Sequence, residues 1–444
     1  FLIFIPMPLV IISLGILFLF LLIIVFRLNA FIAFILVSIA IGIGQGMELN
    51  AIVSSIEKGI GNTLGFLVMI LGLGAMLGKL VAESGAAQKI TNGLISLFGI
   101  KNTRTAVMLT GFIVGITMFY SVGFVILVPL VFTVATATGL SLISIALPML
   151  AALSVTHGFL PPHPAPSALS IMFEADLGKT LIYGIVVAIP AIIISGPVLT
   201  RFIPKVDAKP LKEFMASKVF EEDELPSLSN SLITALLPVI LIGFSTVIGN
   251  FIATDHFLYS IIKFIGNPVI ALLLTVLIGI YTLGIARGNT MEGIMKIFGT
   301  AVSGITMVLL IISGAGALKQ ILIDSGVSNY IGSLLELTSM SPLIIAWLIA
   351  TLIRFSVGSA TVAGLTTAGI VLPLVQSSGV SPELMVLAIG SGSLMLSHVN
   401  DSGFWLFKEY FNLSVKETLS TWTVMETSIG ITGLLGVLIL ENFI

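Results

Sequence analysis

The sequence of 444 residues contains no cysteine, three tryptophans and only 9% charged residues. The absence of cysteine excludes disulfide bonds and thiolate metal sites. An ordinary soluble domain is also excluded, because about a quarter of the residues of such a domain are charged. A net charge of −2 without a basic block excludes nucleic acid as a partner. Hydrophobic residues make up 57% of the chain, a composition typical of a membrane protein that crosses the lipid bilayer several times.

Motifs of energy-consuming or hydrolytic chemistry are missing as well. No Gly-Lys-Ser/Thr loop is present, which excludes a pump with its own ATP site. No His-Glu-x-x-His or Gly-x-Ser-x-Gly element indicates an intramembrane hydrolase. The histidines lack metal-ligand spacing, so we expect neither a metal nor a cofactor. The sequence therefore favours a protein that is not an enzyme.

Long apolar runs divide the chain into spans of about 20 residues, the length that crosses a bilayer. Uninterrupted runs are 8–26, 30–46, 63–83, 181–200, 232–249, 268–285, 301–322 and 421–440. The first run is long enough to span by itself, so we expect no cleavable signal. Four other apolar regions contain interruptions, at 104–138, 142–173, 343–376 and 383–410. The one strongly polar stretch, 201–230, is predicted to be a linker between two halves.

The two halves resemble each other in short matches that keep their order and nearly their spacing. The matches include Glu83-Ser-Gly85 with Asp324-Ser-Gly326, Tyr120-Ser-Val-Gly123 with Phe355-Ser-Val-Gly358, and His157 with His398. We therefore predict an all-α protein of two repeats, 1–200 and 231–444. Each repeat has three scaffold helices, a re-entrant hairpin, a broken helix and a last helix. The predicted parts are scaffold 1–103, hairpin 104–138, broken helix 142–173 and last helix 181–200, then scaffold 231–342, hairpin 343–376, broken helix 383–410 and last helix 420–440.

Whether the two repeats have the same or the opposite orientation in the membrane depends on whether the hairpins cross it. An arm of about 14 residues rises only about 21 Å as a helix, short of a core of roughly 30 Å. A hairpin that enters and returns leaves an odd number of crossings in each half. The halves are then inverted repeats, an arrangement typical of secondary transporters. With this topology most loop lysines and arginines fall on the side of the linker, which predicts a cytoplasmic linker and both termini outside.

The stretch from Ser154 to Pro166 holds two of the four histidines and four prolines between apolar segments. Proline removes a backbone donor and interrupts a helix. In hydrocarbon a broken backbone is tolerated only where protein buries it or where it lines a watery cavity. A surface loop is the alternative interpretation. The position of His157 nevertheless indicates a candidate binding site at membrane depth.

Arg354 lies within an apolar segment at the predicted tip of the second hairpin. An arginine there costs at least about 2.5–3.5 kcal/mol, so it usually pairs or faces a cavity. The alternative is an arginine at the membrane boundary that extends to water. Hydroxyls and glycine amides beside a guanidinium suit a carboxylate. The predicted substrate-binding set at the two hairpin tips is Arg354, Ser356, Gly358, Ser359, Thr361, Ser121 and Gly123.

A second polar interruption, Ser397 to Gly403, corresponds to the His157 interruption in the other repeat. We expect Asn400, Ser402 and His157 to bind substrate hydroxyls. Asp401, His398 or His157 could carry a proton, because burial and neighbouring charges change the protonation of such groups. The alternative is that these side chains only satisfy the broken backbone. Sodium coupling competes with proton coupling, since hydroxyl and carbonyl oxygens also suit Na⁺.

Two other classes of membrane protein compete with a transporter. A channel needs a continuous polar pore, whereas the polar residues here occur in clusters. An intramembrane enzyme could use Asp401 and His398 and would alter its substrate chemically.

Three motifs in order carry a family resemblance: His157-Gly-Phe-Leu-Pro-Pro-His-Pro-Ala-Pro166, Gly358-Ser-Ala-Thr-Val-Ala363 and Ser397-His-Val-Asn-Asp-Ser-Gly-Phe-Trp405. Over essentially its whole length the chain resembles the gluconate permease family of the ion-transporter superfamily. The resemblance implies an inverted-repeat homodimer that works by an elevator motion. It also implies proton-coupled import of gluconate or a related small carboxylate across the bacterial inner membrane. Sugar acids, glycerate and D-serine are all substrates within this family, so the resemblance does not fix the ligand.

Overall fold

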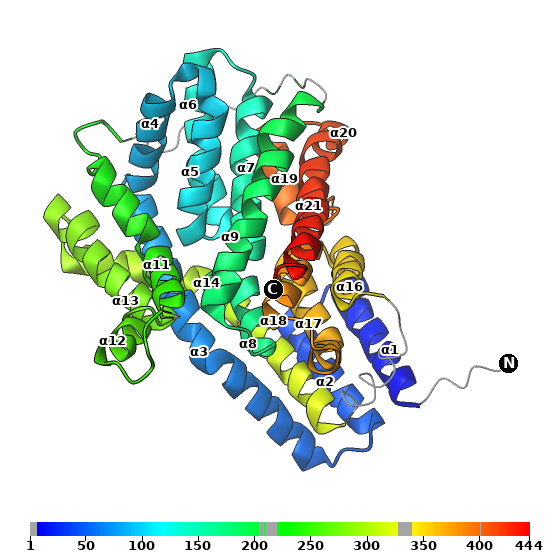
Figure 1. Cartoon of the computed structure of the whole chain (residues 1–444). Helices are drawn as coiled ribbons and strands as arrows, with labels where there is room; N and C mark the ends of the chain where they lie inside the picture. Colours follow the sequence, from blue (N-terminus) through cyan, green and yellow to red (C-terminus); the bar gives the residue numbers. More distant parts are fainter. Residues whose placement is uncertain are drawn as a thin grey trace.

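The computed structural model describes residues 7–203, 206, 208, 220–249, 251–326, 340–399 and 401–444 (Figure 1). In this part of the chain every regular element is helical and no β-strand occurs, which confirms the predicted all-α class. The first half contains α1 (Met7–Phe20), α2 (Ala30–Gly44), α3 (Leu49–Glu83), α4 (Ala86–Phe98), α5 (Thr103–Thr117), α6 (Tyr120–Thr138), α7 (Leu142–Phe159), α8 (Pro164–Met172) and α9 (Leu177–Ile193).

The second half follows the polar linker and again consists of helices. They are α11 (Leu228–Ile248), α12 (Phe257–Ile265), α13 (Pro268–Gly279), α14 (Met291–Asp324), α16 (Pro342–Val357), α17 (Ala360–Ser378), α18 (Pro382–Gly392), α19 (Ser402–Tyr410), α20 (Val415–Thr418) and α21 (Val424–Glu441). Short π or 3-10 segments extend several of these helices: η1 (Leu21–Val25), η2 (Ile100–Asn102), η3 (Ile194–Val198), η4 (Leu199–Arg201), η5 (Ile280–Gly284), η6 (Ile285–Arg287) and η7 (Leu419–Thr423).

Seven helical stretches in the described residues are long and apolar enough to cross a membrane. They are Leu49–Glu83, Leu142–Met172, Leu177–Arg201, Leu228–Ile248, Pro268–Arg287, Met291–Asp324 and Val415–Glu441. A multi-pass membrane protein is the class that such a set defines.

Several helix boundaries differ from the prediction. The helices α3 and α14 begin at Leu49 and Met291, earlier than the predicted spans 63–83 and 301–322. The N-terminal part of α3 carries Glu57 and Lys58, and that of α14 carries Glu292 and Lys296, so the apolar runs start later than the helices. The short helices α4 and α12 were not predicted, because each is shorter than a span. The predicted scaffold region 231–342 also includes residues 327–339, which lie outside the described residues.

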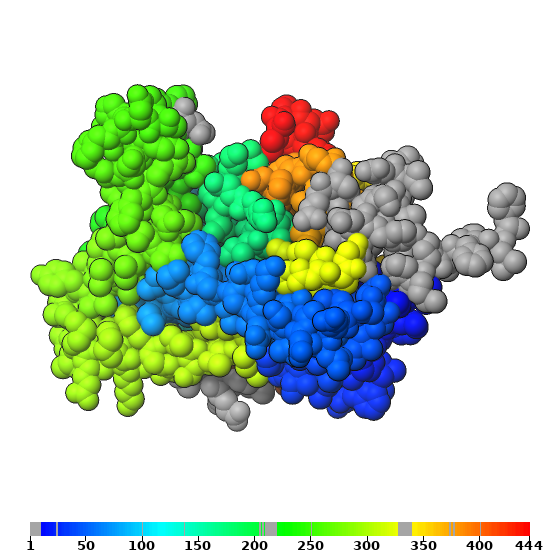
Figure 2. Space-filling view, turned by 90° about the horizontal axis from the view of Figure 1, so that it is seen from below, coloured from blue at the N-terminus to red at the C-terminus, as the bar shows by residue number. Residues whose placement is uncertain are grey.

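The two longest helices, α3 and α14, cross each other in close contact (Figure 1). A Cβ placed on Gly59 would meet the Gly316 carbonyl oxygen, and one on Gly316 would meet Thr63. Asp324 accepts hydrogen bonds from Ser55 Oγ at 2.7 Å and from Gln320 Nε2 at 2.9 Å near the end of α14. Small residues at a crossing let two membrane helices approach closely. Seen from below, Figure 2 shows the blue surface of the N-terminal helices beside the yellow surface of α14.

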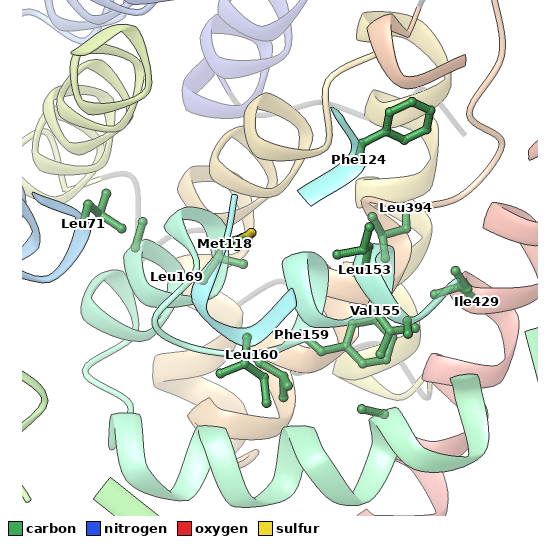
Figure 3. Close-up of a cluster of buried hydrophobic side chains, with 14 of the residues drawn as sticks. Leu71, Met118, Phe124, Leu153, Val155, Phe159, Leu160, Leu169, Leu394 and Ile429 are labelled. Atoms are coloured by element: carbon green, nitrogen blue, oxygen red, sulfur yellow. The ribbon is translucent and has the colours of Figure 1, made fainter. Parts of the chain in front are cut away.

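The centre of the molecule is formed by α7 and α8. In Leu142–Met172, 83% of the most apolar stretch is buried, against 33–50% in the other six spans. Figure 3 shows Leu153, Val155 and Phe159 of α7 close to Leu394 and Ile429. All five of these side chains are almost fully buried. The interruption between α7 and α8 therefore lies inside protein rather than at the surface.

Four interruptions separate pairs of consecutive helices. Between α5 and α6, Met118 and Phe119 are extended, with ψ of 138° and 142°. Between α7 and α8 lie Pro161 and Pro162, which cannot continue a helix. Gly358, with φ of +75°, ends α16 in the left-handed conformation that favours glycine. Between α18 and α19, residues 393–401 have no helical assignment where they are described.

Candidate functional site

The four interruptions meet around a cavity of about 310 Å³, which we call the junction cavity. Its lining from the interruptions and the turns beside them comprises Phe119, Tyr120 and Ser121; Ser154, His157 and Pro164; Arg354, Gly358, Ser359, Ala360 and Thr361; and Leu394, Asp401, Ser402, Gly403 and Leu406. Val308 of α14, Trp422 of η7 and Glu426 of α21 complete it. Segments more than 200 residues apart in sequence thus share one site.

Arg354 is the buried cation of the junction cavity, with 3% of its side chain exposed. It lies in the last turn of α16, and its Nη2 forms an ion pair with Asp401 Oδ2. Within the described residues, Nε and Nη1 of Arg354 are buried and have no hydrogen-bond partner. Buried donors without partners cost free energy, which an anion in the cavity would recover.

Asp401 is held by three donors. Its Oδ2 accepts hydrogen bonds from Arg354 and from Ser397 Oγ, and its Oδ1 accepts from the Gly403 amide at 2.9 Å. Ser397 Oγ in turn accepts a hydrogen bond from Trp422 Nε1 at 2.8 Å. The carboxylate therefore fixes the position of Arg354 and caps the N-terminus of α19.

Three helices present their N-terminal turns to the junction cavity. The first-turn residues in the lining are Tyr120 and Ser121 of α6, Ala360 and Thr361 of α17, and Ser402 and Gly403 of α19. The first amides of a helix have no partner within it and carry the positive end of the helix dipole. Such N-termini favour anions, and here they surround a buried guanidinium.

His157 and His163 lie close together at the α7–α8 interruption, with ring centroids 5.4 Å apart. His163 Nε2 donates a hydrogen bond to the Gly115 carbonyl at 2.6 Å and so ties the interruption to α5. His157 faces the cavity, and its Nδ1 is buried without a partner in the described residues. His157 is thus free to bind a ligand polar group, whereas His163 is engaged by the backbone.

Most of the predicted site residues line the junction cavity. These are Ser121, His157, Arg354, Gly358, Ser359, Thr361, Asp401 and Ser402. Gly123 lies below the cavity lining, where it lets α6 pack against Leu153 of α7. Ser356 donates its hydroxyl to the Leu352 carbonyl at 2.9 Å within its own helix. His398 packs outside the lining, where its Nε2 donates to the Phe355 carbonyl at 3.1 Å; Asn400 lies outside the described residues.

Sequence reasoning missed several lining residues, of which Glu426 is the most informative. It lies in the predicted last helix 420–440, which we interpreted as a plain span. Its side chain is 2% exposed and accepts a hydrogen bond from Ser154 Oγ. The signal was available, because a carboxylate inside an apolar span is costly and usually functional.

Two solved membrane transporters share this fold. The chain superposes on the Alcanivorax borkumensis YdaH transporter with a TM-score of 0.64 and 16% identity, covering 99% of this chain and 98% of that chain. Neisseria gonorrhoeae MtrF, an antimetabolite efflux pump, gives a TM-score of 0.65 and 16% identity, covering 99% and 95%. At this identity the likeness shows the fold alone. The chain therefore has the fold of these two proteins.

Comparison of the sequence with known families identifies the kind of transporter. Residues 7–444 match the family described as GntP family permease, and the chain belongs to this family. It is 50% identical to the high-affinity gluconate transporter of Escherichia coli (strain K12) over 415 residues, 93% of this chain and 94% of the relative. The Gnt-II system L-idonate transporter of the same organism is 49% identical over 408 residues, 92% and 93% of the two chains. The gluconate permease of Bacillus subtilis (strain 168) is 47% identical, covering 89% and 91%. The relatives are permeases and transporters, so this protein is a transporter and not an enzyme.

Proposed function

We propose that the protein imports gluconate or a related small sugar-acid carboxylate across the bacterial inner membrane by proton symport. The observation that carries this proposal is Arg354, a buried guanidinium whose Nε and Nη1 are unpaired beside an open cavity. The relatives named for gluconate and L-idonate support a sugar acid. A volume of about 310 Å³ lies at the lower end of the roughly 300–1,000 Å³ typical of small-molecule sites.

In this proposal the substrate carboxylate binds Arg354 and the amides and hydroxyls of Ser121 and Ser359 to Thr361. The hydroxyl groups of the sugar acid then bind His157, Ser402 and Asn400. Polar groups that hydrogen-bond a hydroxyl discriminate strongly against analogues that lack it. This arrangement favours a polyhydroxy acid over glycerate or D-serine, both of which are shorter.

For the transport cycle we propose an elevator-type motion in a homodimer built of two inverted repeats. The hairpins (α5–α6 and α16–α17), the broken helices (α7–α8 and α18–α19) and the last helices (α9 with η3, and α21 with η7) would move together with the substrate. The scaffold helices, which include α3 and α14, would stay fixed. Val308 of α14 supports this division, because among the described residues it is the one scaffold residue in the cavity lining. The 15 residues of α5 and 16 of α16 rise about 22–24 Å, which supports re-entrant first arms. The second arms, α6 and α17, have 19 residues each and rise about 28 Å, so they are longer than the predicted arms of about 14 residues.

Uptake into proteoliposomes tests the proposed function. Purified protein should accumulate labelled gluconate when the outside is acidified, with sodium absent on both sides. Competition by unlabelled gluconate, L-idonate, glycerate and D-serine then ranks the substrates. Accumulation only with a sodium gradient would replace the proton by Na⁺. Passive flux without accumulation would indicate a channel.

A further inference from the structure

The Glu426 carboxylate has no role in the substrate-binding scheme above, although it lines the same cavity. Its side chain is 2% exposed. Within the described residues it accepts one hydrogen bond, from Ser154 Oγ of α7, and takes part in no ion pair. An acid inside a membrane helix usually pairs with a cation or takes part in the movement of ions or protons. Glu426 has no such cationic partner among the described residues.

Asp401 is the other carboxylate of the junction cavity, and its position is already determined. Both of its oxygens accept hydrogen bonds, and one of them also forms the ion pair with Arg354. A proton on Asp401 would break this ion pair and release the guanidinium that is proposed to hold the substrate. Asp401 is therefore better suited to be a fixed counter-ion than a site of reversible protonation.

The charges in the cavity link an anion to a proton. Arg354 and Asp401 cancel each other, so an ionised Glu426 leaves one negative charge. A bound carboxylate would raise the total to two negative charges in a site with little water, where like charges repel strongly. A proton on Glu426 removes one of them. Substrate binding and proton binding should thus favour each other.

Other titratable groups near Glu426 come from the elements packed against α21. Those that share its cavity are Tyr120 of α6, His157 of α7, Arg354 of α16 and Asp401 before α19. The helices α9 and α21 run antiparallel, because Ser195 bonds Ser428 while Val187 lies against Gly436. The titratable residues of α9, Lys179 and Tyr183, therefore lie toward the end of α21 that is far from Glu426. On α18 the acidic residue is Glu383, which is engaged by Ser381 and the Asp176 amide. His157 is therefore the competing proton acceptor.

We propose that Glu426 is the group that binds the coupled proton, with Asp401 as the permanent partner of Arg354. The inference rests on the proposed proton symport. A proton from the outer solution binds a Glu426 oxygen and forms a neutral carboxylic acid while the substrate carboxylate binds Arg354. After the site opens inward, the substrate leaves and the O–H bond breaks, which returns the proton to the inner solution. No other bond changes.

Proton uptake on gluconate binding tests the assignment in the purified full-length protein. Calorimetric titration at a series of pH values, in buffers of different ionisation enthalpy, measures the protons taken up per gluconate bound. For the wild type the uptake should be near zero where Glu426 is already protonated and should rise to about one at higher pH. Because one proton binds together with gluconate, the affinity of the wild type for gluconate should depend on pH. Above the range in which Glu426 is protonated, it should fall up to about tenfold for each pH unit. Glu426→Gln should bind gluconate with no proton uptake and with an affinity independent of pH. In proteoliposomes this variant should exchange gluconate but not accumulate it under a pH gradient.

Glu441→Gln, at the exposed end of the same helix, is the matched control and should behave as wild type. Unchanged proton uptake in Glu426→Gln would overturn the assignment, as would loss of binding in a folded variant, because glutamine mimics the protonated acid. If Glu426→Gln does not fold, Ser154→Ala tests the same point. Loss of the hydroxyl donor should move the half-point of proton uptake to higher pH, and an unmoved half-point would contradict the proposal. Failure of the wild type to take up a proton at any pH of the series would instead reject proton symport itself.

Discussion

Arg354 in the last turn of α16 and Asp401 directly before α19 form an ion pair at the junction cavity, with side chains 3% and 13% exposed. The pair leaves Nε and Nη1 of the arginine without partners in the described residues. The protein thus holds the guanidinium through Nη2, and Arg354 lines a cavity of substrate size. The following predictions depend on this division.

Arg354→Ala should abolish gluconate binding, and it should also destabilise the fold. Removal of one member of a buried ion pair costs about 3–5 kcal/mol, because the other charge is left uncompensated. The double variant Arg354→Ala with Asp401→Asn should recover most of the thermal stability but none of the binding. Thermal unfolding and gluconate titration in detergent measure both properties. Arg201→Ala, an exposed arginine after α9, is the control. Binding by the double variant would remove Arg354 from the site.

Two hydroxyl residues at the α16–α17 junction should differ in their effect on affinity. Thr361 lines the cavity, whereas Ser356 bonds a carbonyl within its own helix. A typical hydrogen bond contributes about 0.5–1.5 kcal/mol, so Thr361→Val should weaken gluconate binding about 2- to 13-fold. Ser356→Ala should leave the affinity within twofold of wild type. Equal effects of both substitutions on the measured dissociation constant would contradict the orientation of the junction.

The contrast between Thr361 and Ser356 shows which features of the site can be predicted from the sequence and which cannot. Arg354 and His157 could be predicted, because charge and helix-breaking prolines stand out in apolar sequence. Ser356 and Gly123 were predicted to bind substrate as well. Each lies only two residues from a lining residue, and the sequence does not fix where the helix ends or which side chains turn toward the cavity. Glu426 was missed because a single acid does not change the apolar character of its span. Its partner Ser154 comes from the other half of the chain, a contact that no local pattern reveals.

The crossing of α3 and α14 should tolerate no side chain at Gly316. A Cβ there would meet Thr63 and the Gly59 backbone, while Gly299 on the same helix has nothing within 4 Å. Gly316→Ala should lower stability by about 1–3 kcal/mol through overpacking. Gly299→Ala should leave stability unchanged or raise it slightly, because alanine favours helix. The midpoint of thermal unfolding of the purified variants distinguishes them, and equal midpoints would contradict the close crossing.

The absence of cysteine allows a direct test of the proposed orientation. Asp223, in the linker, and Glu441, near the C-terminus, are both exposed. A membrane-impermeant maleimide added to intact cells should label Glu441→Cys but not Asp223→Cys. Permeabilised cells should label both, which controls for reactivity. The reverse pattern in intact cells would place the linker outside and invert the topology.

The central claim is that the junction cavity holds the substrate carboxylate against the free donors of Arg354. An experimental structure of the protein with gluconate bound tests it most directly. The account predicts the carboxylate within hydrogen-bond distance of Arg354 Nε or Nη1, with the hydroxyl groups extending toward His157 and Ser402. Gluconate bound elsewhere, with those two nitrogen atoms still unpaired, would contradict it.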